Sequence, residues 1–171
     1  MNKPDKIGPS VHTIPEGDDR SRLTCLDCGY VAYDNPKVIV GAVCVWEEKF
    51  LMCQRAIEPR KDYWTFPAGY LELNETMADG AAREAWEEAT AKVRITGLLG
   101  IYEIPGISQV YAIYKADLEE PSFAAGPESA DVQLLNWSEI PWDDLAFPSV
   151  TWGLERFRDG GEPVMYEHRS T

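Results

Sequence analysis

The chain has 171 residues, a length typical of one globular domain with room for a small appendage. Hydrophobic residues make up 44% and charged residues 26%, which is enough apolar material for a core and excludes a disordered chain. The formal net charge of −13 argues against nucleic acid or an anionic membrane as a partner, because like charges repel. An anionic ligand would need local positive charge, for which a metal ion is the obvious source.

The sequence also indicates where the protein resides. No apolar run is long enough to span a membrane, and the stretch MNKPDKIGPS lacks the apolar segment of a secretory signal. Of the four cysteines, Cys44 and Cys53 lie in apolar segments, where reduced, buried cysteines are usual. We therefore expect a cytoplasmic protein in a reducing environment, with no membrane partner.

The first part of the chain changes character along its length. Residues 1–22 are rich in proline, glycine and charge and show no period, so we expect a loop. Residues 23–36 carry a Cys-x-x-Cys-Gly knuckle. Two apolar or β-branched runs follow, KVIVGAVCVW and KFLMCQRAI, and the Glu-Glu between them predicts a hairpin. The segment WTFPAGYLEL is expected to be extended.

The rest of the chain combines helical and strand patterns. A helix capped by Asn74 or Thr76 is predicted, because alanine recurs at helical spacing between residues 78 and 89. Further strands are expected within residues 91–105, 108–118 and 131–140, and a short helix within 148–163, ended by Gly160. Strands before and after a central helix, with a second helix at the end, predict an α/β sandwich around a mixed sheet.

The central helix carries three carboxylates on one face. Glu84, Glu87 and Glu88 stand at positions i, i+3 and i+4, where each like-charged pair costs about 0.2–0.5 kcal/mol. One interpretation is a solvated face whose repulsion is small. The other is a hard-cation site, because Mg²⁺ takes oxygen ligands and bridges carboxylates to phosphates. A backbone carbonyl of the Gly69 turn could complete such a site. The residues alone leave both interpretations open.

These acids belong to a longer spaced pattern. Gly69 is followed after five residues by Glu75, and after seven more by Arg-Glu-Ala-Trp-Glu-Glu, residues 83–88. This arrangement resembles the box of the Nudix hydrolase family, in which Arg-Glu-apolar-x-Glu-Glu is followed by x-Gly-apolar. Thr90 departs from the box, which has glycine there. The small Ala85 and Ala91 hold its apolar positions, so the departures concern the end of the helix and not the carboxylates.

The resemblance implies a Nudix α/β/α sandwich and a metal-dependent pyrophosphatase. It assigns Mg²⁺ or Mn²⁺ to the ligands Gly69, Glu84, Glu87 and Glu88, has Arg83 orient a glutamate, and has Glu75 brace the loop. Bound cations neutralise a pyrophosphate and lower the pKa of the attacking water. The implied substrate is a nucleoside diphosphate linked to another moiety. ADP-ribose, giving AMP and ribose 5-phosphate, comes first, with FAD and NADH as alternatives.

Residues outside the box supply further candidates. Glu128, in a Gly/Pro loop before a strand, is our choice for a catalytic acid or base, although a solvated loop glutamate fits the pattern as well; Glu72 and Glu103 are alternatives. Arg55 could bind a phosphate or form a surface ion pair. Trp64, Phe66 and Tyr111 are chosen as substrate-binding residues, although aromatic residues in strands commonly belong to a core. Tyr70, Tyr102 and Tyr114 share that ambiguity.

The knuckle resembles half of the N-terminal zinc ribbon found in one Nudix subgroup. In that comparison Cys25 and Cys28 are one cysteine pair, and the other pair falls near Lys3 and Lys6, which cannot replace thiolates. A structural zinc site needs four ligands, so we expect a vestigial ribbon over residues 1–34 without zinc, followed by a Nudix domain over 35–171. An exposed dithiol or disulfide, or ordinary structural cysteines, are the other interpretations.

Two other classes of function remain as rivals. A nucleotide sensor would keep the fold and lack turnover, but the intact carboxylates of the box oppose it. A ribbon-type nucleic-acid binder is opposed by the negative charge and the missing cysteine pair. We expect a small-molecule nucleotide as the partner, and the family resemblance allows a homodimer.

Overall fold

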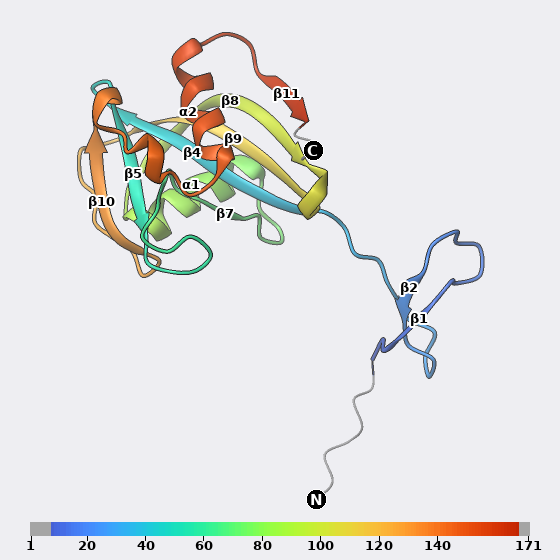
Figure 1. The fold of residues 1–171 in the computed structure, drawn as a ribbon. Helices are drawn as coiled ribbons and strands as arrows, with labels where there is room; N and C mark the ends of the chain where they lie inside the picture. The colour runs from blue at the N-terminus through green and yellow to red at the C-terminus, as the bar shows by residue number, and fades with distance from the viewer. Residues whose placement is uncertain (1–7, 168–171) are drawn as a thin grey trace, which may run out of the picture. The chain divides into compact units, whose positions relative to one another are not determined.

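The computed structural model describes residues 8–167, so the predictions placed on Lys3 and Lys6 lie outside the described residues. The chain divides into two compact units, residues 1–36 and residues 37–171 (Figure 1). The first unit holds a small antiparallel sheet of three strands in the order β1-β2-β3. They are β1 (Val11–Thr13), β2 (Arg22–Thr24) and β3 (Val31–Ala32).

The prediction of a loop over residues 1–22 was therefore wrong for part of its length. Strands of two or three residues are too short to display the alternation by which a strand is recognised in a sequence. The loop between β1 and β2 is tied by an ion pair of 3.0 Å between Asp18 and Arg22, and Asp18 also accepts from the backbone N–H groups of Asp19 and Arg20. These bonds, led by the one from Arg22, hold the pKa of Asp18 below its usual value.

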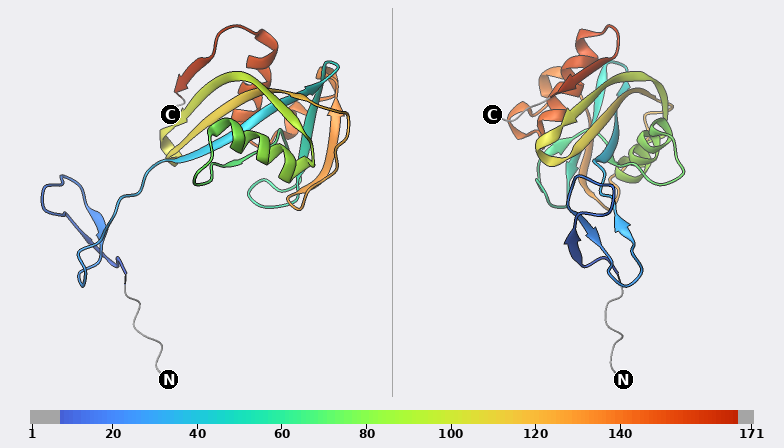
Figure 2. Two further views of the ribbon diagram at one scale, coloured as in Figure 1. Left: turned by 180° about the vertical axis from the view of Figure 1, so that it is seen from behind. Right: turned by 90° about the vertical axis from the view of Figure 1, so that its right-hand side faces the viewer.

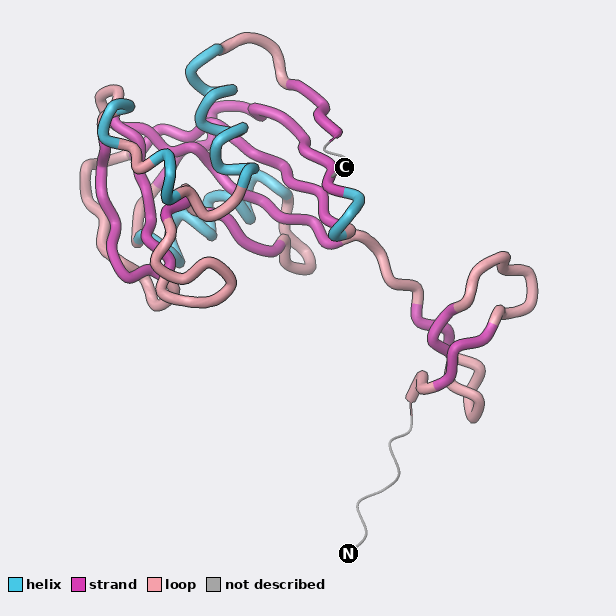
Figure 3. The backbone as a smooth tube through the Cα atoms, viewed as in Figure 1, coloured by secondary structure: helices cyan, strands magenta, loops and turns pink. Residues whose placement is uncertain are grey.

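The second unit is built on an eight-stranded mixed sheet (Figure 3). Its main path runs β10-β5-β4-β9-β8-β11, with β6 paired to β5 and β7 paired to β4. The β4–β9 and β8–β11 pairs are parallel and the others are antiparallel. The strands are β4 (Lys37–Trp46), β5 (Lys49–Arg55), β6 (Trp64–Thr65), β7 (Ala68–Tyr70), β8 (Val93–Ile104), β9 (Gln109–Leu118), β10 (Ser129–Leu135) and β11 (Val164–Glu167).

The two α-helices cover opposite faces of this sheet, as Figure 1 and the edge-on view in Figure 2 show. They are α1 (Met77–Ala89) and α2 (Pro148–Asp159). Short 3₁₀ helices η1 (Pro105–Ile107), η2 (Trp137–Glu139) and η3 (Trp142–Asp144) lie in the connections. The predicted α/β/α sandwich and the β4–β5 hairpin are confirmed. The edge strand β11, which the sequence analysis did not predict, pairs with β8.

Neighbouring side chains of each strand point to opposite faces of the sheet, so the core consists of two clusters, one on each face. In β4, Ala42 and Cys44 belong to the cluster beneath α1, whereas Val43 belongs to the cluster beneath α2. The α1 face of the first cluster is made by the fully buried Ala81, Ala85 and Ala89. Alanine lets the helix axis lie close to the sheet, which brings the adjacent carboxylates down to the level of β4 and β7.

The ends of α1 are both fixed by threonines. The Thr76 hydroxyl accepts from the backbone N–H of Asp79 at 3.1 Å, which makes Thr76 rather than Asn74 the N-cap. At the other end Thr90 adopts a left-handed conformation with φ 46°. Neither of the two α-helices, nor any other helix within residues 8–167, is long and apolar enough to cross a membrane.

Candidate functional site

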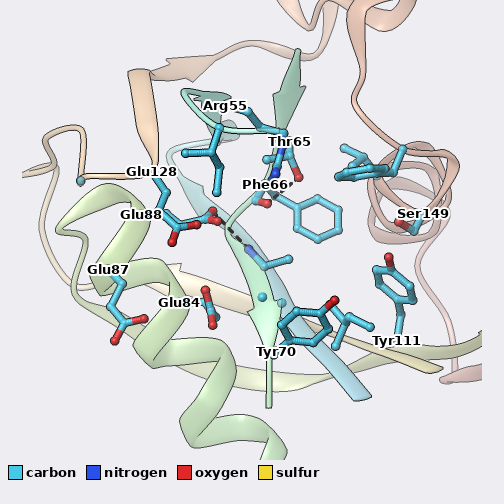
Figure 4. A pocket seen from close by; sticks show the side chains of 18 of the residues that line it. Arg55, Thr65, Phe66, Tyr70, Glu84, Glu87, Glu88, Tyr111, Glu128 and Ser149 are labelled. Atoms are coloured by element: carbon cyan, nitrogen blue, oxygen red, sulfur yellow. Dashed lines mark hydrogen bonds between the residues drawn. The ribbon is translucent and has the colours of Figure 1, made fainter. Parts of the chain in front are cut away.

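A cavity of about 870 Å³ opens between the carboxylate face of α1 and the residues around the start of α2. Figure 4 shows its two sides: Glu84, Glu87, Glu88 and Glu128 on one, and Phe66, Tyr70, Tyr111 and Ser149 on the other. This volume lies in the range of sites that bind small molecules and cofactors. The cavity therefore combines an acidic end with an aromatic end.

Arg83 binds four groups around the acidic end. Its guanidinium donates twice to Glu75, at 2.8 and 3.0 Å, and once to the carbonyl of Tyr70 at 2.9 Å. Its Nη1 also donates to Glu84 at 2.7 Å and to Glu87 at 2.8 Å. The two bonds from Arg83, with a further bond from the Glu72 backbone, lower the pKa of Glu75 to about 2. Glu75 and Arg83 thus join the β7 turn to α1.

Glu84 and Glu88 are buried carboxylates that stand close to the β7 backbone. Glu84 is 7% exposed, and its carboxylate leaves no room for a side chain at Gly69, where an added Cβ would lie 2.5 Å from it. Glu88 is 6% exposed and accepts a bond of 3.3 Å from the backbone N–H of Ala68. Burial is the main reason that the pKa of Glu88 rises to about 8, and the charge of Glu84 adds to it. Burial also raises the pKa of Glu84.

The chemistry of these groups suits a divalent cation. Among the described residues no basic side chain forms a direct ion pair with Glu88. Glu84, Glu87 and Glu88 line the same cavity, and carboxylate oxygens are ligands that Mg²⁺ and Mn²⁺ prefer. As the side chains stand, no group of three or more acidic, histidine or cysteine side chains within residues 8–167 has an arrangement that could hold an ion. Glu84 and Glu87 form ion pairs with Arg83 instead. The exposed Glu87 would have to turn to join a metal site.

The loop before β10 lies directly against the end of α1. The backbone N–H groups of Ala124 and Gly126 donate to the carbonyls of Ala89 and Glu88, both at 2.9 Å. The approach is so close that an added Cβ at Gly126 would lie 1.8 Å from the Glu87 carbonyl oxygen. Glycine is required here by space, and the contact delivers the loop to the edge of the cavity.

Replacing Gly126 with Ala is therefore expected to lower the free energy of unfolding by about 2 kcal/mol or more, because the loop must move off the helix. Gly97→Ala is the matched control, since an added Cβ at Gly97 meets nothing within 4 Å. Chemical denaturation of both variants measures the difference. Equal stabilities for the two would contradict the proposed packing of the loop.

The structure brings most of the predicted substrate-binding residues to the cavity. Arg55, Phe66 and Tyr111 line it. The Arg55 Nε donates to the Pro59 carbonyl at 2.9 Å, and its guanidinium stands 5.3 Å from the ring centre of Phe147. These contacts hold the positive charge of Arg55 beside the cavity, on the same side as Glu88. The charge of Arg55 slightly lowers the pKa of Glu88.

Trp64 is an exception and does not line the cavity. Neighbouring residues of a strand point to opposite sides, so Thr65 faces the cavity while Trp64 packs against the core beneath α2. Of the alternative acids, Glu72 lines the cavity and Glu103 does not. Tyr102 likewise lies away from it and stacks on Trp152 at 5.7 Å.

Trp86, Phe147 and Ser149 are among the lining residues that escaped the sequence analysis. Trp86 precedes Glu87 on α1 and is 51% exposed. Its position within the box could have indicated that it belongs to the site. Phe147 and Ser149 flank the first residue of α2. Nothing in their local sequence indicates a site, because only the packing of α2 on the sheet brings them to the cavity.

Comparison with known proteins agrees with this geometry. A family model described as the NUDIX domain matches residues 35–154. The chain belongs to the Nudix hydrolase family. The Nudix resemblance read from the box is thereby confirmed. Thr90 stands where the family pattern has glycine.

Individual relatives span most of the chain. The phosphatase NudJ of Escherichia coli (strain K12) is 47% identical over 135 residues, which cover 73% of this chain and 85% of that protein. The ADP-ribose pyrophosphatase of Methanocaldococcus jannaschii is 25% identical over 122 residues, 69% of this chain and 71% of that protein. A solved structure of a NUDIX hydrolase from Nitrosomonas europaea is 42% identical with a TM-score of 0.85, covering 92% of this chain and 94% of that one.

A second model, the Nudix N-terminal zinc ribbon, matches residues 8–34. Within that range Cys25 is buried and Cys28 is exposed, and backbone N–H groups of Cys28 and Asp27 lower the pKa of the Cys25 thiol. The other cysteines, Cys44 and Cys53, are buried in the core of the Nudix domain. The ribbon thus offers two of the four thiolates that a closed zinc site needs.

Since we expect the knuckle to bind no zinc, we expect Cys28→Ser, at an exposed thiol, to change neither the melting temperature nor the activity by more than the error of measurement. Elemental analysis of the purified wild-type protein gives the metal content directly. Stoichiometric zinc, together with a large loss of stability in Cys28→Ser, would show that the knuckle binds the metal after all.

Proposed function

We propose that this Nudix hydrolase is a divalent-metal-dependent pyrophosphohydrolase that cleaves a nucleoside diphosphate linked to another moiety, with ADP-ribose as the first candidate. The observation that carries the proposal is the cavity itself. Two buried carboxylates, Glu84 and Glu88, stand at one end and aromatic rings stand at the other. A substrate with a charged diphosphate and a flat base complements both ends.

Each end has its own task in the proposed reaction. Glu84, Glu87 and Glu88, with the Gly69 turn, would hold Mg²⁺ or Mn²⁺, which supplies neutralisation of the diphosphate and a bound water of lowered pKa. Arg55, on the same side of the cavity as Glu88, would bind a phosphate oxygen. Glu128, beside Glu88 at the cavity edge, accepts the proton of the attacking water (Figure 4).

The aromatic end would bind the base. Phe66 and Tyr111 line the wall between β7 and α2, and the Tyr111 hydroxyl donates to the Gln109 side chain at 2.9 Å. Stacking of an adenine ring on one of these residues would place the diphosphate toward Glu88. Water attack on the diphosphate then releases AMP and ribose 5-phosphate from ADP-ribose.

The relatives support this substrate class in different ways. The Methanocaldococcus jannaschii protein is an ADP-ribose pyrophosphatase, which favours ADP-ribose over FAD and NADH. The more similar Escherichia coli protein is a phosphatase, and this favours a second candidate activity, release of a terminal phosphate from a diphosphate or triphosphate. The same acidic end of the cavity could serve either cleavage.

A substrate panel separates these candidates. Purified protein with Mg²⁺, and separately with Mn²⁺, is given ADP-ribose, FAD, NADH, diadenosine polyphosphates and nucleoside di- and triphosphates, and the products are resolved by chromatography. AMP from ADP-ribose is the expected result, and Glu88→Gln is the control for contaminating enzymes. Inorganic phosphate released only from nucleoside di- or triphosphates would favour the phosphatase. Tight binding by calorimetry without any turnover would favour a sensor.

A further inference from the structure

Thr90 has an unusual backbone for its residue type. It ends α1 in the left-handed region, with φ 46° and ψ 27°, and its N–H donates to the carbonyl of Trp86. Glycine adopts this conformation freely, whereas a β-branched residue there is a rare and strained exception. The family pattern has glycine at this position, so the threonine of this chain keeps the left-handed turn at an energetic cost. A side chain that persists under strain calls for a compensating contact.

The contact is made with the loop before β10. The Thr90 hydroxyl donates to the carbonyl of Ala124 at 3.0 Å. The N–H of the same residue, Ala124, donates to the carbonyl of Ala89 at 2.9 Å. Ala124 is therefore held to the end of α1 through both its carbonyl and its N–H. A glycine at position 90 could keep the turn but not the hydroxyl bond.

The tether continues toward the cavity. Two residues after Ala124, the N–H of Gly126 donates to the carbonyl of Glu88 at 2.9 Å, and the carbonyl of Gly126 accepts from Ser129 at 3.1 Å. The carbonyl of Glu128 accepts from Ala56 at 2.8 Å. The backbone that carries Glu128 is thus fixed on one side to α1 and on the other to the end of β5. Only the Thr90 bond in this series is made by a side chain.

We propose that Thr90 is a positioning residue whose hydroxyl holds the 124–128 loop against α1 and thereby sets the place of Glu128 at the cavity. The inference rests on the proposed function in one respect, namely that Glu128 takes part in the reaction. Thr90 itself acts through the loop and not on the substrate. The glycine of the family pattern could not take this role, because it has no side chain to make the bond.

Three substitutions separate the hydroxyl from the backbone. Thr90→Val keeps the branched shape and the strain but removes the donor, and it is expected to lower kcat about 10-fold with little change in KM, since small displacements of a reacting group lower rates by such factors. Thr90→Ser keeps the donor and should retain nearly full activity. Thr90→Gly relieves the strain, so it should raise the melting temperature by roughly 2–4 °C while lowering kcat as Thr90→Val does.

Coupling to Glu128 is read from the double variant. If Thr90 acts through Glu128, adding Thr90→Val to the Glu128→Gln variant should lower kcat by less than about twofold. An equal 10-fold loss in both backgrounds would overturn the proposal, as would full activity of Thr90→Val. The combination of raised stability and lowered kcat in Thr90→Gly is a result that a purely structural role of Thr90 does not produce.

Hydrogen exchange tests the tether without any activity. Backbone amides of residues 124–128 should exchange faster in Thr90→Val and Thr90→Gly than in the wild type, and at the wild-type rate in Thr90→Ser. Unchanged exchange in Thr90→Val overturns the proposal. Wild-type protein that turns over none of the panel would instead count against the proposed function, and the exchange rates would still decide whether Thr90 holds the loop.

Discussion

Replacing Glu88 with Gln is expected to lower kcat by at least about 100-fold while the protein stays folded. Glu88 is the most deeply buried of the carboxylates at the acidic end, and none of the ion pairs within residues 8–167 involves it. Glutamine keeps its size but cannot bind a hard cation as a carboxylate does. Loss of groups that merely orient metal ligands already costs 10–100-fold, so loss of a ligand should cost more. Glu84→Gln should behave similarly.

Steady-state kinetics on the substrate found in the panel measures this effect, and circular dichroism checks the fold. Glu155→Gln is a suitable control, because Glu155 is an exposed glutamate on α2 that does not line the cavity. Near-wild-type kcat in both Glu84→Gln and Glu88→Gln would remove these residues from the active site. A 100-fold loss confined to them would place the reaction at the acidic end.

The metal-free protein is expected to lose stability as the pH rises from about 5 to about 9. The pKa of Glu88 is raised from 4.5 to about 8 in the folded state, chiefly by burial, so folding favours the protonated carboxyl. A raised pKa contributes stability that is fully present below pH 4.5 and is lost as the pH passes about 8. One pKa unit corresponds to about 1.4 kcal/mol, which makes the loss on the order of a few kcal/mol.

The pKa values of the neighbouring carboxylates show why the loss of stability falls between about pH 5 and about pH 9. Burial also raises the pKa of Glu84, so its contribution has the same sign. The bonds from Arg83 lower the pKa of Glu75 to about 2, and its contribution is therefore present above pH 4.5 and is lost only in stronger acid. Between pH 5 and pH 9 the buried carboxylates dominate, and the half-buried Glu75 does not change its charge.

Urea denaturation in the presence of a chelator, repeated across this pH range, measures the loss. Glu88→Gln should flatten the profile and be more stable than the wild type at pH 9, because it removes the buried charge. Added Mg²⁺ or Mn²⁺ should stabilise the wild type most at high pH, since the cation binds the ionised carboxylates of the folded protein. A profile that is flat in the wild type, or equally steep in Glu88→Gln, would contradict this account of Glu88.

Much of the site could be predicted from local spacing. Residues three and four apart on a helix must share a face, so the grouping of Glu84, Glu87 and Glu88 followed from the sequence as soon as the helix was recognised. The Nudix resemblance implied that Arg83 orients a glutamate and that Glu75 braces the loop, and in the structure these two residues bind each other. The hairpin and the alanine face of α1 followed from periods of two and 3.6 residues.

Other features depended on contacts between distant parts of the chain. Trp64 and Tyr111 carry similar sequence signals, yet Tyr111 lines the cavity and Trp64 packs beneath α2. The very short strands of residues 8–36 and the edge strand β11 have too few residues to show a period. Ser149 reaches the cavity only because α2 packs on the sheet.

The sequence by itself determined that this protein is a Nudix hydrolase with an acidic helix, because a box of fixed residue types and a helical period are local properties of the chain. The tertiary structure alone decided that Arg83 binds the carbonyl of Tyr70, that Glu88 is buried beside Glu128, and that Thr90 binds a loop more than thirty residues away. Such contacts join segments whose separation along the chain bears no relation to their distance in space. The energies of these contacts depend on the burial of the side chains and on the distances between their atoms, and neither can be read from the order of residues.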